Sequence, residues 1–344
     1  MSNFVFSHYD AAGNSVYDPD VFPFTAAQVT ALKAAAIGAG IVLNSTATVN
    51  AAANTSVLAA ALAAGGVVNL MGVGTLTINS WPAGVTSSLL NIPSGMTVTD
   101  GASRIDGPIN LCCGMWPNGR TKSDAVTNGT NIITSATMSF NGRDTGKLVT
   151  VVNPLNFAQK FTGTISGVGS TTSITVNSAV TGSWTGGIIF VGTDCATAAA
   201  LYLTQQSGQR QGSTQFPQGI YMLSTGLTVP DGISMQGDGR QWSIFNSPTA
   251  YGTAFVACAT AGGAFPTSYL IKIGSNVTKV GVIGSRLFEI TAIGSNLVTN
   301  VVEQTGCGSE MVNCRILWGA STGVLLSPLV GKMLTNHISQ MLTG

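Results

Sequence analysis

Short runs of alternating apolar and polar residues, broken by glycine and proline, make up most of this chain. The clearest run, residues 90–99, is repeated later as residues 227–236, and each copy holds a Pro-x-Gly sequence between two alternating segments. Alternation with a period of two predicts strands, and Pro-x-Gly predicts a tight corner between them. Repetition of such a unit indicates an architecture of stacked repeats.

An alanine-rich segment with a polar residue at its head precedes each repeat. Asn54 stands before residues 55–64, and Asp194 stands before residues 195–206. Because Asn and Asp are preferred at the N-cap of helices, we expect one short helix before each repeat. A further short helix is predicted for residues 24–37, where the apolar pattern is followed by glycines.

The segment between the two repeats, residues 123–193, has closely spaced runs of β-branched and aromatic residues. Turns such as Asn-Gly and Gly-Ser-Thr separate the runs, and this spacing predicts a small antiparallel sandwich or barrel. We expect a spacer domain, with a binding module as the alternative, and we expect Asp144 and Lys147 to be turn residues. The predicted strands are residues 130–135, 138–140, 148–152, 161–168, 173–176 and 187–191.

Similar sequences recur near the C-terminal end of the chain. Residues 311–316 and 333–338 are 22 positions apart, close to the length of one coil of a parallel β-helix, and residues 278–283 fit an earlier coil. One coil cannot bury its apolar face alone, so the coils must stack. We expect a β-helix that either is short or has its exposed end covered by another chain.

The segment from Asp194 to Phe245 resembles the opening of the pectate-lyase-like right-handed β-helix of phage tailspikes, tail fibres and secreted polysaccharide lyases. The resemblance implies a cap helix followed by the first coils, a homotrimer, and an N-terminal region that docks to other tail proteins. The family includes lyases, hydrolases and adhesins without catalytic activity, so the resemblance indicates a fold more than an activity. It rests on Asp194-Cys-Ala-Thr-Ala-Ala-Ala-Leu, Phe216-Pro-Gln-Gly-Ile-Tyr and Leu227-Thr-Val-Pro-Asp-Gly-Ile-Ser-Met-Gln-Gly-Asp-Gly.

These patterns together predict an all-β-dominated chain: a right-handed parallel β-helix with short N-terminal helices and an inserted small β-sandwich or barrel. Residues 1–40 form an N-terminal arm and helix, which packs on its own domain or anchors the protein in a virion. Residues 41–122 form a first cap helix with its β unit. The small antiparallel β domain occupies residues 123–193, and the second cap helix and short β-helix occupy residues 194–344.

Composition narrows the classes of partner. Charged residues make up 8% of the chain and 43 of its 344 residues are glycine, whereas ordinary domains have about 25% charged residues and about 7% glycine. Asn, Ser, Thr and Gly interrupt every apolar run, so we expect no membrane insertion. A net charge of +1 with scattered cations argues against nucleic acid as a partner. The N-terminal sequence lacks the pattern of a secretory signal, and release by lysis fits a virion location.

Cysteine and histidine offer little chemistry. The six cysteines form no C-x-x-C pair, and the two histidines, His8 and His337, stand at opposite ends of the chain. We therefore expect neither a metal site nor a Ser-His-Asp set. The Gly237-Asp-Gly239 sequence lacks the strand-to-helix setting of a dinucleotide loop, so we expect no cofactor.

Four residues are candidates for contact with a glycan. Glu303 and Glu310 are the candidate catalytic carboxylates, because their spacing allows one face and a glycosidase needs two carboxyl groups about 5 to 10 Å apart. Trp242 and Trp318 are candidates for stacking on a sugar, although we favour a role in the core or in a subunit contact for them.

Two main hypotheses follow. In the first, the chain is a structural or adhesive component of a phage tail that attaches to the virion and contributes to host-surface attachment, without enzymatic activity. In the second, it is a polysaccharide depolymerase of the β-helix type, acting as a lyase or a glycoside hydrolase on host surface polysaccharide. A bacterial surface adhesin is a third option.

Overall fold

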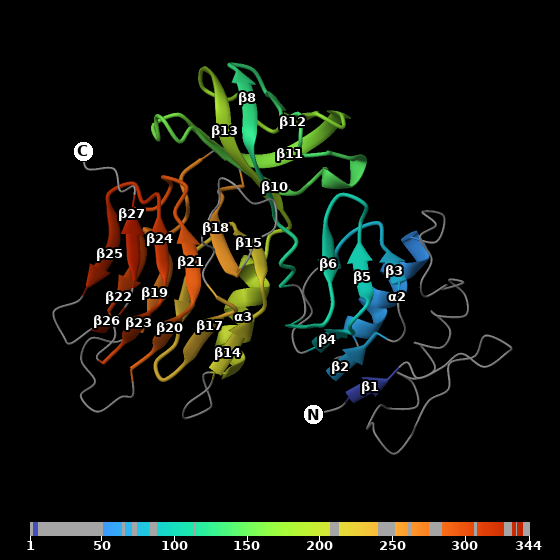
Figure 1. Cartoon of the computed structure of the whole chain (residues 1–344), viewed down its shortest axis with the longest axis vertical. Helices are drawn as coiled ribbons and strands as arrows, with labels where there is room; N and C mark the ends of the chain where they lie inside the picture. Colours follow the sequence, from blue (N-terminus) through green and yellow to red (C-terminus); the bar gives the residue numbers. More distant parts are fainter. Residues whose placement is uncertain are drawn as a thin grey trace, which may run out of the picture. The chain divides into compact units, whose positions relative to one another are not determined.

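The structure is a computed structural model. It describes residues 3–5, 51–63, 66–70, 74–82, 88–112, 115–206, 213–239, 252–260, 263–274, 284–305, 308–326, 332–334 and 336–339. The predicted helix at residues 24–37, the predicted coil at residues 278–283 and Trp242 lie outside the described residues. Strands dominate the described chain, and the α-helices in it are α2 (Ala51–Ala63) and α3 (Ala196–Gln206) (Figure 1). The chain divides into two compact units, Met1–Trp116 and Pro117–Gly344.

The first unit contains helix α2 and two small sheets. One sheet has the order β1 (Asn3–Val5), β2 (Gly66–Asn69), β4 (Ser88–Ile92), β7 (Ile109–Cys112), and the other has the order β3 (Gly74–Thr77), β5 (Met96–Thr99), β6 (Arg104–Asp106). Strands β2 and β4 pair in parallel, as do β3 and β5, whereas β7 and β6 add antiparallel pairs. The first sequence repeat therefore pairs in parallel with the preceding segment, residues 66–77.

Helix α2 begins earlier than its sequence indicates. It starts at Ala51, so Asn54 lies inside the helix and is not its N-cap. The buried Asn54 side chain instead donates a hydrogen bond from Nδ2 to the carbonyl oxygen of Thr77 at 2.7 Å. The Asn54 side chain therefore makes a tertiary hydrogen bond to β3 and does not cap the helix as expected.

The second unit begins with a closed antiparallel barrel, one of the two forms expected for this segment. Its strands follow the order β10-β11-β12-β9-β8-β13. Side chains such as Val149, Val151 and Ile189 alternate into an apolar interior with Trp184. The strand bounds are β8 (Arg120–Asn128), β9 (Ile132–Thr134), β10 (Leu148–Val152), β11 (Lys160–Ser170), β12 (Ser173–Val176) and β13 (Ser183–Gly192).

Two sequence expectations for the barrel were wrong. Residues 138–140 form no strand, because Ser139 has a positive φ of 57° and the chain turns into the 3₁₀ helix η3 (Gly142–Asp144). Strand β8 was missed because its apolar face is built from small or polar residues, with Thr121, Ala125 and Thr127 buried.

After helix α3 the chain passes repeatedly through three parallel sheets. The first sheet contains β14 (Ser213–Phe216), β17 (Ser234–Gly237), β20 (Arg286–Phe288), β23 (Glu310–Val312) and β26 (Lys332–Leu334). The second sheet contains β15 (Gly219–Leu223), β18 (Thr253–Ala257), β21 (Ile290–Ile293), β24 (Arg315–Leu317) and β27 (His337–Ser339). The third sheet contains β16 (Leu227–Val229), β19 (Tyr269–Ile273), β22 (Asn300–Gln304) and β25 (Thr322–Leu326). One passage through the sheets is called a coil here, and Figure 1 shows the coils in succession from β14 to β26.

Equivalent residues of successive coils stack in register. In the second sheet Tyr221 pairs with Phe255 and then Ala292, and all three are fully buried. The repeat seen in the sequence is confirmed as register, because Met311 pairs with Met333. Ile316 likewise pairs with Ile338.

Both Pro-x-Gly sequences form the expected corners between sheets. The first links β4 to β5 and the second links β16 to β17. Gly95 and Gly232 have φ values of 81° and 78°, a conformation that glycine adopts without the steric cost of a side chain.

The barrel packs on the outward face of the second sheet. Its strands β10 and β13 and four successive strands of that sheet share one apolar cluster. Trp318 completes the interface, with ring centroids 5.8 Å from Phe157 and 6.2 Å from Phe190. The main apolar contacts come from Leu148, Val152, Ile188, Phe190, Ile220, Met222, Ala254, Val256, Ile293 and Leu317.

Candidate functional site

A row of polar residues crosses the outward face of the third sheet. Thr228 on β16 pairs with Lys272 on β19, which pairs with Glu303 on β22. All three side chains are partly exposed, whereas the flanking residues Ile271 and Ile273 are fully buried. The alternation of the strands therefore places this polar row toward solvent and its apolar neighbours in the core.

Tyr269 joins this row through its ring and its hydroxyl group. The Tyr269 and Thr228 hydroxyl groups lie 3.1 Å apart and share a hydrogen bond. The Lys272 Nζ lies 5.6 Å from the centroid of the Tyr269 ring and 3.1 Å from Oε1 of Glu303. We call Thr228, Tyr269, Lys272 and Glu303 the Tyr269 cluster.

The backbone next to the cluster is held by a partly buried hydroxyl group, that of Thr267, just before β19. The backbone N–H of Gly226 donates to Oγ1 of Thr267 at 3.1 Å, and the Thr267 hydroxyl donates to the carbonyl oxygen of Tyr269 at 2.6 Å. Thr267 thus connects the start of β16 to the start of β19. This connection ties the backbone of Tyr269 to the neighbouring coil.

The charges within the cluster cancel. Lys272 and Glu303 side chains are 27% and 14% exposed, so the ion pair is partly shielded and contributes up to about 1 kcal/mol. Tyrosine combines an apolar ring with a polar hydroxyl, and hydroxyl groups both donate and accept hydrogen bonds. Such a surface can contact the C–H groups and the hydroxyl groups of a sugar.

The two candidate catalytic carboxylates do not share a face. Glu303 is on β22 of the third sheet, whereas Glu310 is on β23 of the first sheet, because the chain turns a corner between Gln304 and Glu310. Glu310 forms its own ion pair, with Arg286 Nε 3.2 Å from Oε2. Among the described strands of the third sheet, Glu303 is the sole acidic residue. The Tyr269 cluster therefore fits a binding surface better than a catalytic pair of carboxyl groups.

Trp318, the other described candidate for sugar contact, has no exposed surface. Its ring lies against Phe157 and Phe190, in the interface between the barrel and the coils. A ring in this position offers no face to a sugar, and we assign it to the interface.

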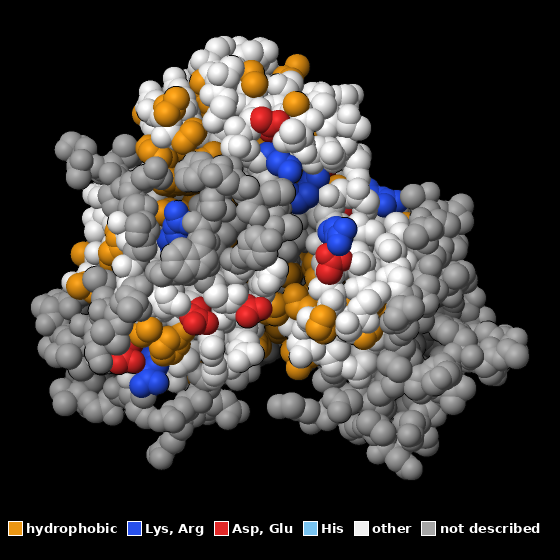
Figure 2. Space-filling model, in the orientation of Figure 1, with side chains coloured by type: hydrophobic (Ala, Val, Ile, Leu, Met, Phe, Trp, Pro, Cys, Tyr) orange, Lys and Arg blue, Asp and Glu red, His pale blue; other side chains and the backbone are white. Residues whose placement is uncertain are grey.

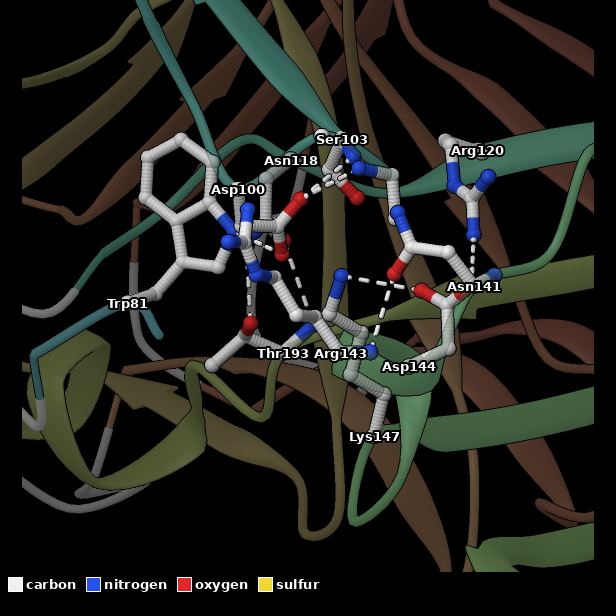
Figure 3. Close-up of polar contacts among 12 residues, drawn as sticks. Trp81, Asp100, Ser103, Asn118, Arg120, Asn141, Arg143, Asp144, Lys147 and Thr193 are labelled. Carbon is white, nitrogen blue, oxygen red and sulfur yellow. Dashed lines mark hydrogen bonds and ion pairs between the residues drawn. The ribbon is translucent and has the colours of Figure 1, made fainter. Parts of the chain in front are cut away.

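The barrel contains a buried ionic network, shown in Figure 3. The carboxylate of Asp144 accepts hydrogen bonds from Lys147 Nζ at 3.0 Å, from Arg120 at 2.7 Å and from the backbone N–H of Asn141 at 3.1 Å. The predicted turn residues Asp144 and Lys147 are thus also ionic partners. This network fixes η3 against β8, and it leaves no carboxylate oxygen of Asp144 without a donor.

The first unit has a buried carboxylate of its own. Asp100 accepts hydrogen bonds from the indole N–H of Trp81 at 2.8 Å and from the backbone N–H groups of Ala102 and Ser103 at 2.8 and 2.6 Å (Figure 3). These contacts shape the turn between β5 and β6. Like the Asp144 network, they stabilise local structure.

In the described residues, no group of three or more His, Cys, Asp or Glu side chains is placed to hold a metal ion. Within the same residues, no helix combines the length and the apolar character needed to cross a membrane. Cys112, Cys195, Cys258 and Cys314, the cysteines that the structure describes, form no disulfide.

Thr228, Tyr269 and Lys272 were missed in the sequence because their association depends on register. Lys272 and Glu303 lie on different coils, and the intervening segment gives no local sign of which residues will pair. The available signal was Lys272 itself, a cation inside the apolar segment Tyr-Leu-Ile-Lys-Ile.

No protein-family model matches the chain, and no curated protein matches it. Among solved structures, the chain is similar to the Gp54 tailspike of Acinetobacter baumannii bacteriophage AP22 in complex with A. baumannii capsular saccharide, with 10% identity and a TM-score of 0.21. The match covers 97% of this chain and 62% of the tailspike chain. A TM-score of 0.21 is too low to establish a common fold.

Proposed function

We propose that this chain is an adhesive component of a phage tail, of the tail-fibre or tailspike kind, that contacts host surface polysaccharide. The observation that carries the proposal is the stack of in-register parallel coils after helix α3, which holds the Tyr269 cluster on an outward face. Within the segment that resembles the tailspike β-helix, from Asp194 to Phe245, the structure describes α3 and strands β14 to β17.

The proposal includes finer features. In it, the coils form a right-handed β-helix of the pectate-lyase-like kind, and three copies of the chain form a homotrimer. Residues 1–40 bind another tail protein, residues 41–122 form a cap helix with its β unit, residues 123–193 form a spacer domain, and residues 194–344 form the adhesive part. The resemblance of the first coil supports these features, and the low proportion of charged residues fits a hydroxyl-rich and amide-rich exterior.

Attachment is favoured over cleavage by the placement of the carboxylates. Glu303 and Glu310 lie on different sheets, and each is engaged by a basic residue of the preceding coil. An inverting or retaining glycosidase instead needs two carboxyl groups that face one glycosidic bond. Adhesion needs only the surface that the Tyr269 cluster offers.

A binding and cleavage assay tests this function. The full chain is incubated with surface polysaccharides from a panel of bacterial hosts, and co-sedimentation and new reducing ends are measured together. We expect binding without cleavage. Tyr269→Ala should weaken binding about tenfold, which corresponds to about 1.4 kcal/mol and is in the range of aromatic contacts.

Phe288→Ala is the matched control, because Phe288 is a partly exposed aromatic residue on the first sheet. Equal loss of binding in both variants would refute the assignment to the third sheet. Release of reducing ends would establish the depolymerase instead. Light scattering tests the homotrimer separately, and a monomer at micromolar concentration would refute it.

A further inference from the structure

Lys272 on the third sheet and Arg286 on the first sheet each stand beside a carboxylate of the next coil. On the third sheet Lys272 pairs with Glu303 at 3.1 Å. On the first sheet Arg286 pairs with Glu310 at 3.2 Å. In both cases the basic residue precedes the acidic residue by one coil in the same outward row. The same neutralisation therefore recurs on two independent faces.

This pairing determines what the Tyr269 cluster can recognise. A glycan carboxylate or sulfate group that approached Lys272 would also meet the carboxylate of Glu303, which the register holds beside the ammonium group. The gain from one charge would be offset by repulsion from the other. The hydroxyl groups of Thr228 and Tyr269 carry no such penalty, and they can donate to or accept from sugar hydroxyl groups.

The wider surface has the same character. On the described part of the face shown in Figure 2, Lys and Arg side chains stand singly or in small groups within uncharged surface. Net charge over the whole sequence is +1.

We infer that the Tyr269 cluster binds a neutral polysaccharide, one of hexose or N-acetylhexosamine units, and discriminates against acidic polysaccharides. This inference rests on the proposed function and adds the class of glycan to it. Glu303 is then a specificity residue: it neutralises Lys272 and excludes anionic sugars.

The test uses one polymer in two charge states. An acidic surface polysaccharide and its carboxyl-reduced form, in which each uronate has become a neutral hexose, are compared for binding to the full chain alongside neutral polysaccharides. We expect the reduced and neutral polymers to bind at least tenfold more tightly than the acidic one. Their affinity should change less than twofold between about 50 and about 500 mM NaCl, because screening acts on charges.

Two variants isolate the role of the paired carboxylate. Glu303→Gln leaves Lys272 without its carboxylate and should raise affinity for the acidic polymer at least fivefold. Added salt should abolish this gain in affinity. Glu310→Gln makes the same change on the first sheet and should leave binding at the Tyr269 cluster unchanged. Both glutamates are partly exposed, so neither variant creates a buried vacancy.

The outcomes separate the two proposals. Tight binding of acidic polymers alone, lost on carboxyl reduction and weakened by salt, would overturn the neutral-glycan inference while the attachment function stands. If no polymer of either charge binds, the proposed function fails and this inference fails with it. An unchanged preference in Glu303→Gln would refute the role given to Glu303.

Discussion

Replacement of Asp144 by asparagine removes the centre of the buried ionic network in the barrel. Asp144 is fully buried, and its partners Arg120 and Lys147 have side chains that are only 17% and 7% exposed. The asparagine side chain has nearly the same shape, so packing is retained. What changes is the negative charge that both cations contact.

The magnitude follows from this burial. Removal of one partner from a buried ion pair costs about 3–5 kcal/mol, because the remaining charge is left uncompensated. Arg120 keeps two backbone acceptors, the carbonyl oxygens of Met138 at 2.9 Å and Ser139 at 3.2 Å. We therefore expect the lower end of the range, about 3 kcal/mol, which corresponds to roughly a hundredfold change in the unfolding equilibrium.

Hydrogen exchange of the barrel strands β8 and β13 measures this change locally. Asp124→Asn is the matched control in the same barrel, because Asp124 accepts hydrogen bonds from the neutral groups of Ser135 and Thr137. Asparagine retains an acceptor oxygen there, and we expect a cost of about 1 kcal/mol. If Asp144→Asn accelerates exchange no more than the control, the argument from the buried ion pairs is wrong.

Three further predictions concern pH, packing and thiol chemistry. Burial raises the pKa of the Asp124 carboxyl group, but hydrogen bonds from Ser135 and Thr137 lower it more, so its pKa lies below the usual value. The ionised Asp124 carboxylate therefore stabilises the fold above about pH 4, the unfolded pKa, and this contribution is lost as pH falls through the folded pKa. The urea midpoint of unfolding should depend less on pH in Asp124→Asn than in the unaltered chain. An unchanged pH dependence would contradict the lowered pKa of Asp124. Trp318→Ala should lower the free energy of unfolding by about 3–5 kcal/mol, measured by thermal unfolding, and should speed proteolysis between the barrel and the coils. An unaltered melting temperature would show that Trp318 does not stabilise this interface. Burial raises the pKa of the Cys258 thiol to about 12, so iodoacetamide at pH 8 should modify the partly exposed Cys112 well before Cys258 in mass spectra, and equal rates would show that Cys258 is accessible.

Local patterns predicted the features that depend on local physics. Strands β10 and β12 have the predicted bounds, because their alternation agrees with the barrel interior. Helix α3 begins one residue later than expected, and Oδ1 of Asp194 accepts the backbone N–H of Ala196 at its head. The pairing of Met311 with Met333 could be predicted from the sequence, because the same apolar residue recurs after one coil length.

Features that depend on which distant strands pair could not be predicted from the sequence. Whether Glu303 and Glu310 share a face depends on where the chain turns between sheets, and spacing along the sequence does not contain that information. For Trp318 the favoured role in the core or in a subunit contact did not name the partner, because only the folded barrel shows that the ring lies against Phe157 and Phe190. The Lys272–Glu303 pair required knowledge of which strand follows which in the third sheet.

The inserted barrel changes how the coils would respond to mechanical load. A stack held together only by neighbouring coils can lose its terminal coil without disturbing the rest. Here one apolar cluster joins barrel residues to Ile220, Ala254, Ile293 and Leu317, which belong to strands of four successive coils. Separation of any one of these coils must also shear the barrel interface, so a pulling force along the stack is shared by all four.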